Sequence, residues 1–210
     1  MLDLDLLTAY CEQLCLPQSD VLRALDRETN LRTLKPRMLS GHLQGALLHM
    51  LIKIHGSKRI LEIGSFTGYA AICMATALPD EGQLITLEAN KELEYISSKY
   101  FKKAGLNDII TQHFGDAKEL ITKLEGSFDF VFIDAGKKDN EYYYEMSLPM
   151  VPSGGLILVD NVLWTGKVLQ EKKDKNTQII HNFNQKMAQD KRIESLYLPL
   201  RDGLAIFRKK

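Results

Sequence analysis

The sequence predicts an α/β protein built on one mostly parallel sheet, and three observations lead to this expectation. Short runs rich in Ile, Leu, Val and Phe recur from residue 58 onward, as in strands buried on both faces. Helix-like segments separate most of these runs, and strands that alternate with helices imply parallel pairing through right-handed crossovers. Only "RDG" separates the last two runs, which is too short for a parallel crossover and predicts an antiparallel hairpin.

The expected elements follow one another in a simple order. Helical spacing of apolar residues predicts three helices in the first part: one at 4–14, one at 20–28 capped by Ser19, and one that begins after Ser40 and stops at Gly56. Two more are expected at 69–78 and 91–104. The expected strands are 59–63, 83–87, 109–114, 128–133, 156–159, 193–200 and 204–208. Together they predict a seven-stranded sheet in which one strand is antiparallel.

Length and composition predict one globular domain. The chain has 210 residues, of which 45% are hydrophobic and 26% charged, and no linker or repeat interrupts it. We expect a single domain at 1–210, with residues 1–56 as helices that cover the site and residues 58–210 as the α/β core. The 27 basic side chains balance the 27 acidic ones, so no global field attracts nucleic acid or membrane. The acidic start "MLDLDLLTAY" and the lack of a long apolar run predict a cytoplasmic protein without a membrane segment.

A glycine turn follows the first predicted strand in "ILEIGSFTGYAA". Such a turn lets a ligand approach the backbone, and the helix start that follows offers free N–H groups. The Gly-Lys-Ser/Thr of a P-loop and the dinucleotide spacing G-x-G-x-x-G are both absent. Glu62, two residues before Gly64, would repel a pyrophosphate but suits a ligand that carries an ammonium group.

The next two strand ends add nucleoside-binding features. Glu88, in "TLEAN", is placed to accept hydrogen bonds from ribose hydroxyls, although such a residue is also common as a solvated loop acid. Asp116 and Ala117, in "FGDA", are placed where an adenine edge can be read. An adenosine that carries an amino acid fits all three strand ends. The sequence therefore predicts S-adenosylmethionine as cofactor.

Polar side chains also follow the fourth and fifth strands. "VFIDAGKKDN" supplies Asp134 and Lys137, and "GGLILVDNVLWTG" supplies Asp160 and Asn161. Two carboxylates and an amide oxygen form an all-oxygen set, which favours a hard cation such as Mg²⁺. The alternative is that Asp160 and Asn161 simply form a turn.

Taken together, these motifs resemble the small, cation-dependent O-methyltransferases, the family of caffeoyl-CoA and catechol O-methyltransferases with many bacterial members. The resemblance runs from "PRMLSGHLQGALL" through "ILEIGSFTGY", "FDFVFIDAGK" and "GGLILVDNVLWTGKV" to "LPLRDGLAIFRK". It implies a class I methyltransferase fold, which is Rossmann-like, and usually a homodimer. It also implies a small aromatic acceptor with neighbouring hydroxyl groups.

The resemblance assigns site residues by position. Asp134, Asp160 and Asn161 correspond to metal ligands for Mg²⁺, with Ca²⁺ or Mn²⁺ as alternatives, and Lys137 corresponds to the proposed base. The substrate contacts that it implies are Lys137, Asn161, Trp164 and Asp202. The cofactor-binding residues that it implies or that the strand ends predict are Met38, Ser40, Glu62, Gly64, Ser65, Phe66, Gly68, Tyr69, Ala70, Glu88, Asp116, Ala117 and Asp134.

Two positions depart from the family pattern and leave alternatives open. Gly136 replaces the second Asp of the usual Asp-Ala-Asp-Lys, and Ala70 replaces a serine that bonds the cofactor's carboxylate in many members. A cofactor-binding protein without turnover is therefore one alternative to the catechol-type enzyme. The other is a methyltransferase of a hydroxylated tRNA base, for which Lys172, Lys173 and Lys175 would supply a local basic patch.

Overall fold

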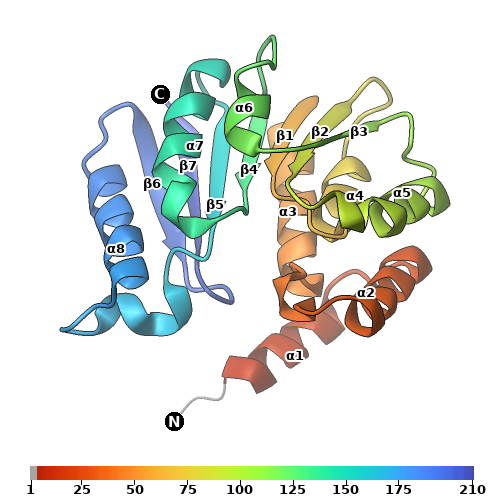
Figure 1. The fold of residues 1–210 in the computed structure, drawn as a ribbon, viewed down its shortest axis with the longest axis horizontal. Helices are drawn as coiled ribbons and strands as arrows, with labels where there is room; N and C mark the ends of the chain where they lie inside the picture. The colour runs from red at the N-terminus through yellow and green to blue at the C-terminus, as the bar shows by residue number, and fades with distance from the viewer. Residues whose placement is uncertain (1–3) are drawn as a thin grey trace.

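The computed structural model describes residues 4–210, so the first three residues of the expected segment 1–56 lie outside the described part. Its centre is a seven-stranded sheet with the strand order β3-β2-β1-β4-β5-β7-β6 (Figure 1). The strands are β1 (Arg59–Ile63), β2 (Gln83–Glu88), β3 (Ile110–Phe114), β4 (Phe130–Ile133), β5 (Leu156–Asp160), β6 (Ile193–Leu198) and β7 (Leu204–Lys209). The pairs among β1 to β5 are parallel, and β7 runs antiparallel to β5 and β6. The predicted mostly parallel sheet with one antiparallel strand is confirmed.

The α-helices are α1 (Leu4–Leu14), α2 (Asp20–Arg32), α3 (His42–His55), α4 (Tyr69–Ala75), α5 (Glu94–Lys103), α6 (Ala117–Ile121), α7 (Asn140–Ser147) and α8 (Lys175–Ala188). Ser19 caps α2 as predicted, because its side chain accepts a hydrogen bond from the Leu22 N–H. Gly56, with a left-handed φ of 72°, ends α3. The expected helix at 91–104 is divided, since a 3₁₀ turn at Lys91–Leu93 precedes α5.

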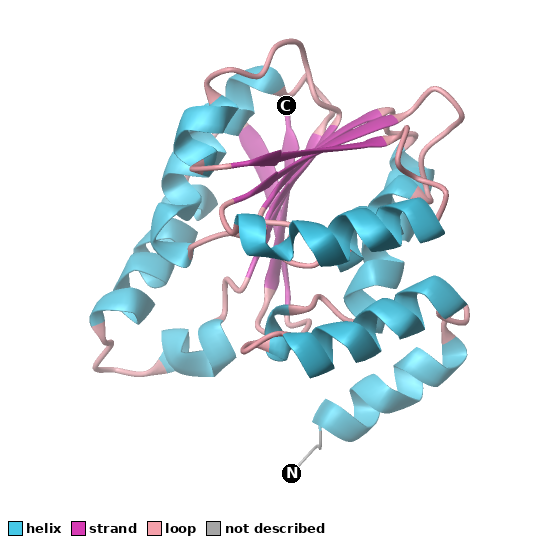
Figure 2. Ribbon diagram, turned by 45° about the vertical axis from the view of Figure 1, so that its right-hand side comes forward, coloured by secondary structure: helices cyan, strands magenta, loops and turns pink. Residues whose placement is uncertain are grey.

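The core lies in two layers, one on each face of the sheet, and Figure 2 shows helices on both sides of the twisted strands. Alternate strand residues supply the two layers. Ile60 and Leu84 pack with α3, α4 and α5, whereas Leu61 and Ile63 pack with α6, α7 and α8. This alternation decides which strand residues face which helices and, as shown below, where Glu62 points.

The strand register brings the functional segments to one edge of the sheet. Ile63, the last residue of β1, lies opposite Leu87 of β2 and Ile133 of β4. Ile133 in turn lies opposite Val159 of β5. The carboxyl ends of these four strands therefore meet, and the order reverses between β1 and β4, where open α/β sheets bind ligands. No helix in residues 4–210 is long and apolar enough to cross a membrane.

Candidate active site

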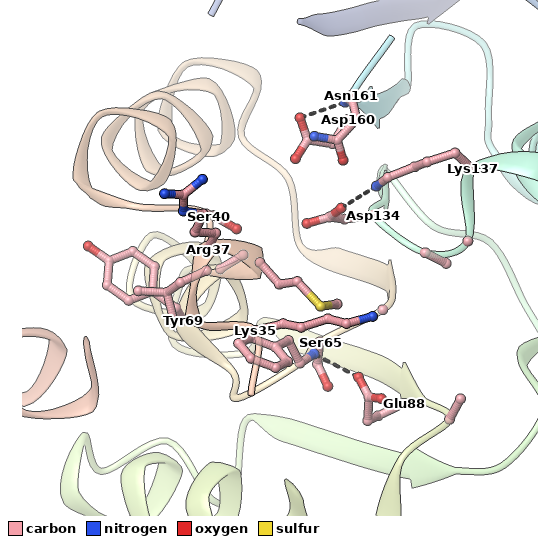
Figure 3. Close-up of a pocket in the computed structure, with 18 of the residues that line it drawn as sticks. Lys35, Arg37, Ser40, Ser65, Tyr69, Glu88, Asp134, Lys137, Asp160 and Asn161 are labelled. Carbon is pink, nitrogen blue, oxygen red and sulfur yellow. Dashed lines mark hydrogen bonds and ion pairs between the residues drawn. The ribbon is translucent and has the colours of Figure 1, made fainter. Parts of the chain in front are cut away.

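A cavity of about 1090 Å³ opens at this carboxyl edge (Figure 3). It exceeds the roughly 300–1,000 Å³ of a typical ligand pocket, so it has room for a cofactor and an acceptor together. Glu62 and Gly68 lie outside its lining. The other residues of the predicted site border it: Met38, Ser40, Gly64, Ser65, Phe66, Tyr69, Ala70, Glu88, Asp116, Ala117, Asp134, Lys137, Asp160, Asn161, Trp164 and Asp202.

The glycine turn after β1 has two positions that exclude a side chain. Gly64 has a φ of 96°, and a Cβ there would lie 2.3 Å from the Asp134 carbonyl oxygen. Gly68 has a φ of 90°, and a Cβ there would lie 2.5 Å from the Phe101 ring. Both glycines are therefore required for the turn to pass between β4 and α5. Gly68 acts on the cavity by shaping the turn.

Glu88, at the end of β2, holds the backbone of the glycine turn that follows β1. Its two carboxylate oxygens accept hydrogen bonds from the Phe66 N–H at 2.7 Å and the Asn90 N–H at 2.8 Å. Phe66 has a left-handed φ of 50°, which is strained for a residue with a side chain. Glu88 is largely buried but borders the cavity, and its carboxylate keeps lone pairs that a ligand can use.

A second set of hydrogen bonds holds the turn to β3 and α5. Ser97 donates to Gln112 Oε1 at 2.7 Å, and Gln112 Nε2 donates to Ser65 Oγ at 2.9 Å. Ser65 and Ser97 are both buried. Gln112 was not predicted from the sequence, because a polar residue in an outer strand carries no signal of its partner.

The N-terminal helices are tied to the same turn. The Thr29 and Thr67 hydroxyls are 2.9 Å apart in a buried hydrogen bond, and Gln18 Nε2 donates to the Tyr69 hydroxyl at 2.5 Å. The segment after α2 then passes along the cavity with Met38 and Ser40. Residues before β1 thus border one end of the cavity, and the covering role expected for residues 1–56 stays a prediction.

Glu62 lies within the sheet, on the face that α4 covers. It is fully buried, its Oε2 accepts a 2.5 Å hydrogen bond from the Thr86 hydroxyl, and its Oε1 has no partner among the described residues. Burial raises the pKa of Glu62 to about 8, against the effect of the Thr86 hydrogen bond. A neutral acid with an unsatisfied oxygen is a place where a cationic group gains by approaching.

Asp116 and Ala117 begin α6 at the other side of the cavity. Asp116 is the N-cap residue, and its side chain accepts a 2.9 Å hydrogen bond from the Lys118 N–H. This explains the aspartate as a structural cap. Both residues also border the cavity, where the expected adenine edge would lie.

Asp134 follows β4 and pairs with Lys137. The Lys137 ammonium donates to Asp134 Oδ1 at 2.7 Å, and both side chains border the cavity (Figure 3). Burial raises the pKa of Asp134 to about 6, while the charges of Lys137 and Arg201 oppose this rise. The carboxylate is thus held in a place where its negative charge is poorly solvated.

Asp160 and Asn161 follow β5. Asp160 Oδ1 accepts a 2.8 Å hydrogen bond from the Asn161 N–H, and its Oδ2 accepts one of 3.1 Å from Gln44 Nε2. Asn161 has a left-handed φ of 61°. Asp160 and Asn161 therefore do form a turn, which was the alternative to a metal site. Both residues still border the cavity, as Asp134 does.

The donor set fits a hard divalent cation. Within residues 4–210 no three His, Cys, Asp or Glu side chains are grouped as metal ligands usually are. The set here is instead two carboxylates and one amide oxygen, from Asp134, Asp160 and Asn161, which is the oxygen chemistry that Mg²⁺ prefers with waters completing its shell. A cation would also compensate the poorly solvated charge of Asp134.

Strained backbone gathers near the part of the cavity that Asp160 and Asn161 border. Among the described residues, Phe66, Asn161, Trp164, Thr165 and Arg201 are those with a positive φ and a side chain, and all except Thr165 border the cavity. The Asp202 carbonyl accepts hydrogen bonds from the Leu163 and Trp164 N–H groups at 2.8 and 3.1 Å. Strain of this kind persists only where surrounding contacts enforce it, and it is typical of functional sites.

Several lining residues were not identified from the sequence. The most important are three cations, Lys35, Arg37 and Arg201. "LKPRML" and "RDG" display them, but an isolated Lys or Arg in a loop is usually a solvated residue. Conversely, Lys172, Lys173 and Lys175 do not border the cavity.

Comparisons with known proteins agree with this architecture. Residues 12–210 match a family described as O-methyltransferase. Among curated proteins, caffeoyl-CoA O-methyltransferase 1 from Eucalyptus globulus is 35% identical over 79% of this chain and 72% of its own length. Flavonoid 3',5'-methyltransferase from Vitis vinifera is 33% identical over 79% of this chain and 76% of its own length.

Solved structures give the same result. An SAH-bound methyltransferase from Podospora anserina superposes with a TM-score of 0.90 at 29% identity, covering 98% of this chain and 94% of that one. An O-methyltransferase from Bacillus cereus in complex with SAH has a TM-score of 0.89 at 29% identity and covers 96% of both chains. The cavity lies at the switch point of a sheet that this group shares. The chain therefore belongs to the O-methyltransferase family and is an S-adenosylmethionine-dependent O-methyltransferase with the class I fold.

Proposed function

We propose that this enzyme methylates one hydroxyl of a vicinal dihydroxy aromatic acceptor and requires Mg²⁺. The observation that carries the proposal is the oxygen set of Asp134, Asp160 and Asn161 at neighbouring strand ends, on the cavity that also contains Glu88. The relatives named as caffeoyl-CoA and flavonoid methyltransferases support an aromatic acceptor.

The cofactor end would bind S-adenosylmethionine in an order set by the strand ends. Glu88 accepts from the ribose hydroxyls with the lone pairs that Phe66 and Asn90 leave free. Ala117 lies against the adenine, and the main chain at Gly64 allows the amino-acid part to approach closely. Ser40 and Met38 cover the cofactor from the N-terminal segment. The chemistry that the cofactor supplies is a methyl group on a sulfonium, which is open to attack by an oxygen nucleophile.

The acceptor end would hold Mg²⁺ through Asp134, Asp160 and Asn161. The chemistry that this ion supplies is Lewis acidity, which makes a neighbouring aromatic hydroxyl more acidic. Lys137 borders the cavity at the same place. Once a cation takes its place beside Asp134 and Lys137 has lost its own extra proton to solvent, the neutral amine would take the hydroxyl proton as the methyl group is transferred. Trp164 gives the ring an apolar wall, so that acceptor and methyl group are held in line. Orientation of this kind can contribute roughly 7–11 kcal/mol.

The test is a methyl-transfer assay with the full chain. Catechol, methyl caffeate and undermodified tRNA are supplied with S-adenosylmethionine, each with Mg²⁺ and with EDTA. We expect a singly methylated catechol product that depends on Mg²⁺ and no product on tRNA. Transfer to tRNA alone, or equal rates with EDTA, would contradict the proposal.

We also propose that the enzyme is a homodimer, as its family resemblance implies. Exposed apolar side chains on α1 and just after it support this, since Tyr10 is 60% exposed, Leu14 70% and Leu16 72%. Light scattering after gel filtration would give twice the 23.9 kDa of the chain. A monomer at micromolar concentration would contradict it.

A further inference from the structure

Cations with no acidic partner gather at the cavity. Of its basic lining residues, only Lys137 has an ion pair within residues 4–210, whereas Lys35, Arg37 and Arg201 have none. Nearby acids have other contacts: Glu88 accepts from two backbone N–H groups, and Asp160 accepts from one and from Gln44. No ion pair within the described residues therefore balances the positive charges of these three side chains, and they lie next to a ligand site.

The structure holds two of them together. Arg201 Nη2 donates to the Arg37 carbonyl at 3.4 Å, although 164 residues separate them in sequence. The Arg201 guanidinium also lies over Gly41, where an added Cβ would be 3.6 Å from Nη1. Arg201 reaches this place from a turn residue with a φ of 50°. The fold thus accepts backbone strain while holding the Arg201 guanidinium against the main chain of the segment that carries Arg37, and both residues border the same cavity.

The position of this pair points to the acceptor. Arg201 directly precedes Asp202, whose carbonyl holds the turn containing Trp164 at the acceptor end. Arg201 also borders the same cavity as Asp134, Asp160 and Asn161, the residues of the oxygen set. Lys35 differs, because Figure 3 shows its side chain extended towards the end with Ser65 and Glu88.

We propose that Arg37 and Arg201 bind an anionic group carried by the methyl acceptor, so that the preferred acceptors are catechols that bear a carboxylate or a phosphate. This inference rests on the catechol methylation proposed above. Guanidinium groups suit both anions, because their planar N–H forks match paired oxygens. Both arginines are exposed, so solvent screening moderates the gain and salt should weaken it.

Three acceptors with one dihydroxycinnamoyl ring test the inference: caffeate, neutral methyl caffeate and caffeoyl-CoA. The measured quantity is kcat/KM for each anionic acceptor divided by that for the ester, in the parent, Arg37→Gln, Arg201→Gln and Arg201→Lys. Arg27→Gln is the matched control, since Arg27 is exposed and does not border the cavity. Isothermal titration with SAH is run on every variant.

We expect Arg201→Gln to lower this ratio by about ten-fold, which corresponds to about 1.4 kcal/mol. Arg37→Gln should act in the same direction, Arg201→Lys should keep part of the ratio, and Arg27→Gln should keep all of it. If the arginine variants lower the ratio for caffeate, the anion that they bind is a carboxylate. If they lower only the ratio for caffeoyl-CoA, the anion is a phosphate. Raising the salt concentration should reduce the parent's ratio.

Three results would overturn the inference. In the first, Arg37→Gln and Arg201→Gln leave the ratios for both anionic acceptors unchanged. In the second, the control Arg27→Gln lowers these ratios equally. In the third, SAH affinity falls in parallel with the ratios, which would assign these cations to the cofactor's carboxylate. If no catechol is methylated with or without Mg²⁺, the proposed function fails and the inference falls with it. That outcome differs from turnover without an anion preference.

Discussion

The two ends of the cavity are built in different ways. At the cofactor end, backbone groups set the shape: Gly64 and Gly68 permit the turn, and Glu88 is held by two N–H groups. At the acceptor end, charged side chains set the shape, and Lys137 forms an ion pair with Asp134. Most of the strained non-glycine residues also lie there or next to it, since Asn161, Trp164, Thr165 and Arg201 outnumber Phe66.

This difference suggests a division of tasks. A backbone cradle can bind one invariant cofactor, because its groups are fixed by the strands and turn that carry them. An acceptor end made of charged side chains on strained loops can be altered residue by residue without disturbing the sheet. Cofactor affinity and turnover should therefore respond to different substitutions, and the following experiments test this separation.

Removal of the divalent ion should have the largest effect. We expect EDTA to abolish methyl transfer while SAH binding and the melting temperature stay nearly unchanged, because the sheet has its own core and Asp134 and Asp160 lie at its edge. Assays with and without added Mg²⁺, together with SAH titration, measure this. A large fall in melting temperature would make the ion structural, and full activity in EDTA would remove it from the mechanism.

Asp160→Asn is the corresponding variant in the chain. It removes the charge but keeps the shape, and Gln44 can turn its amide to match, because its Oε1 has no partner in the described structure. We expect loss of Mg²⁺-dependent activity with normal folding. Asp160→Ala would also lose activity, but it leaves a buried Gln44 donor unpaired, at a cost of about 1–3 kcal/mol in stability.

Lys137→Met should come next. It keeps the apolar stem and removes the amine, so we expect at least about a 100-fold loss in kcat, the lower end of what proton transfer contributes, with normal binding of SAH and Mg²⁺. Lys138→Met is the control, because Lys138 is exposed and does not border the cavity. Small and equal losses in the two variants would show that the ion and positioning suffice.

The sequence predicted residues at both ends of the cavity but missed the cations that border it, for a physical reason. Strand order and a glycine turn leave clear patterns, so the places of Gly64, Glu88 and Ala117 followed from them. The place of Arg201 depends on a left-handed φ and on a contact with residue 37, and neither leaves a pattern in sequence. Glu62 was expected beside the cofactor, but strand alternation turns it towards the α4 face, outside the cavity lining.

Glu88→Gln should affect the cofactor end alone. An ionised acceptor bonded to hydroxyl groups is worth more than a neutral amide, so we expect cofactor binding to weaken by about 1–2 kcal/mol. Gln also has one acceptor oxygen for the N–H groups of Phe66 and Asn90, which loosens the turn. Calorimetry should show weaker SAH binding, while kcat at saturating cofactor stays near that of the parent. Unchanged affinity would remove Glu88 from the site.

Glu62→Gln tests whether the buried acid belongs to the fold, to the cofactor or to both. Burial raises the pKa of Glu62 to about 8 from its ordinary value of 4.5, so between these pH values the folded chain holds a proton that the unfolded chain releases. This contribution to stability is complete below pH 4.5 and is lost as the pH rises to about 8. The Gln side chain cannot titrate. The melting temperature of the variant minus that of the parent should therefore rise by a few degrees between pH 5.5 and 8, at about 2–4 °C per kcal/mol. Parallel melting curves would contradict the raised pKa.

Titration of the Glu62→Gln variant with SAH then separates a structural role from a role in cofactor binding. Equal affinities of variant and parent leave Glu62 as a buried structural acid. Weaker binding by the variant means that Glu62 Oε1, which has no partner among the described residues, contacts the cofactor's ammonium group.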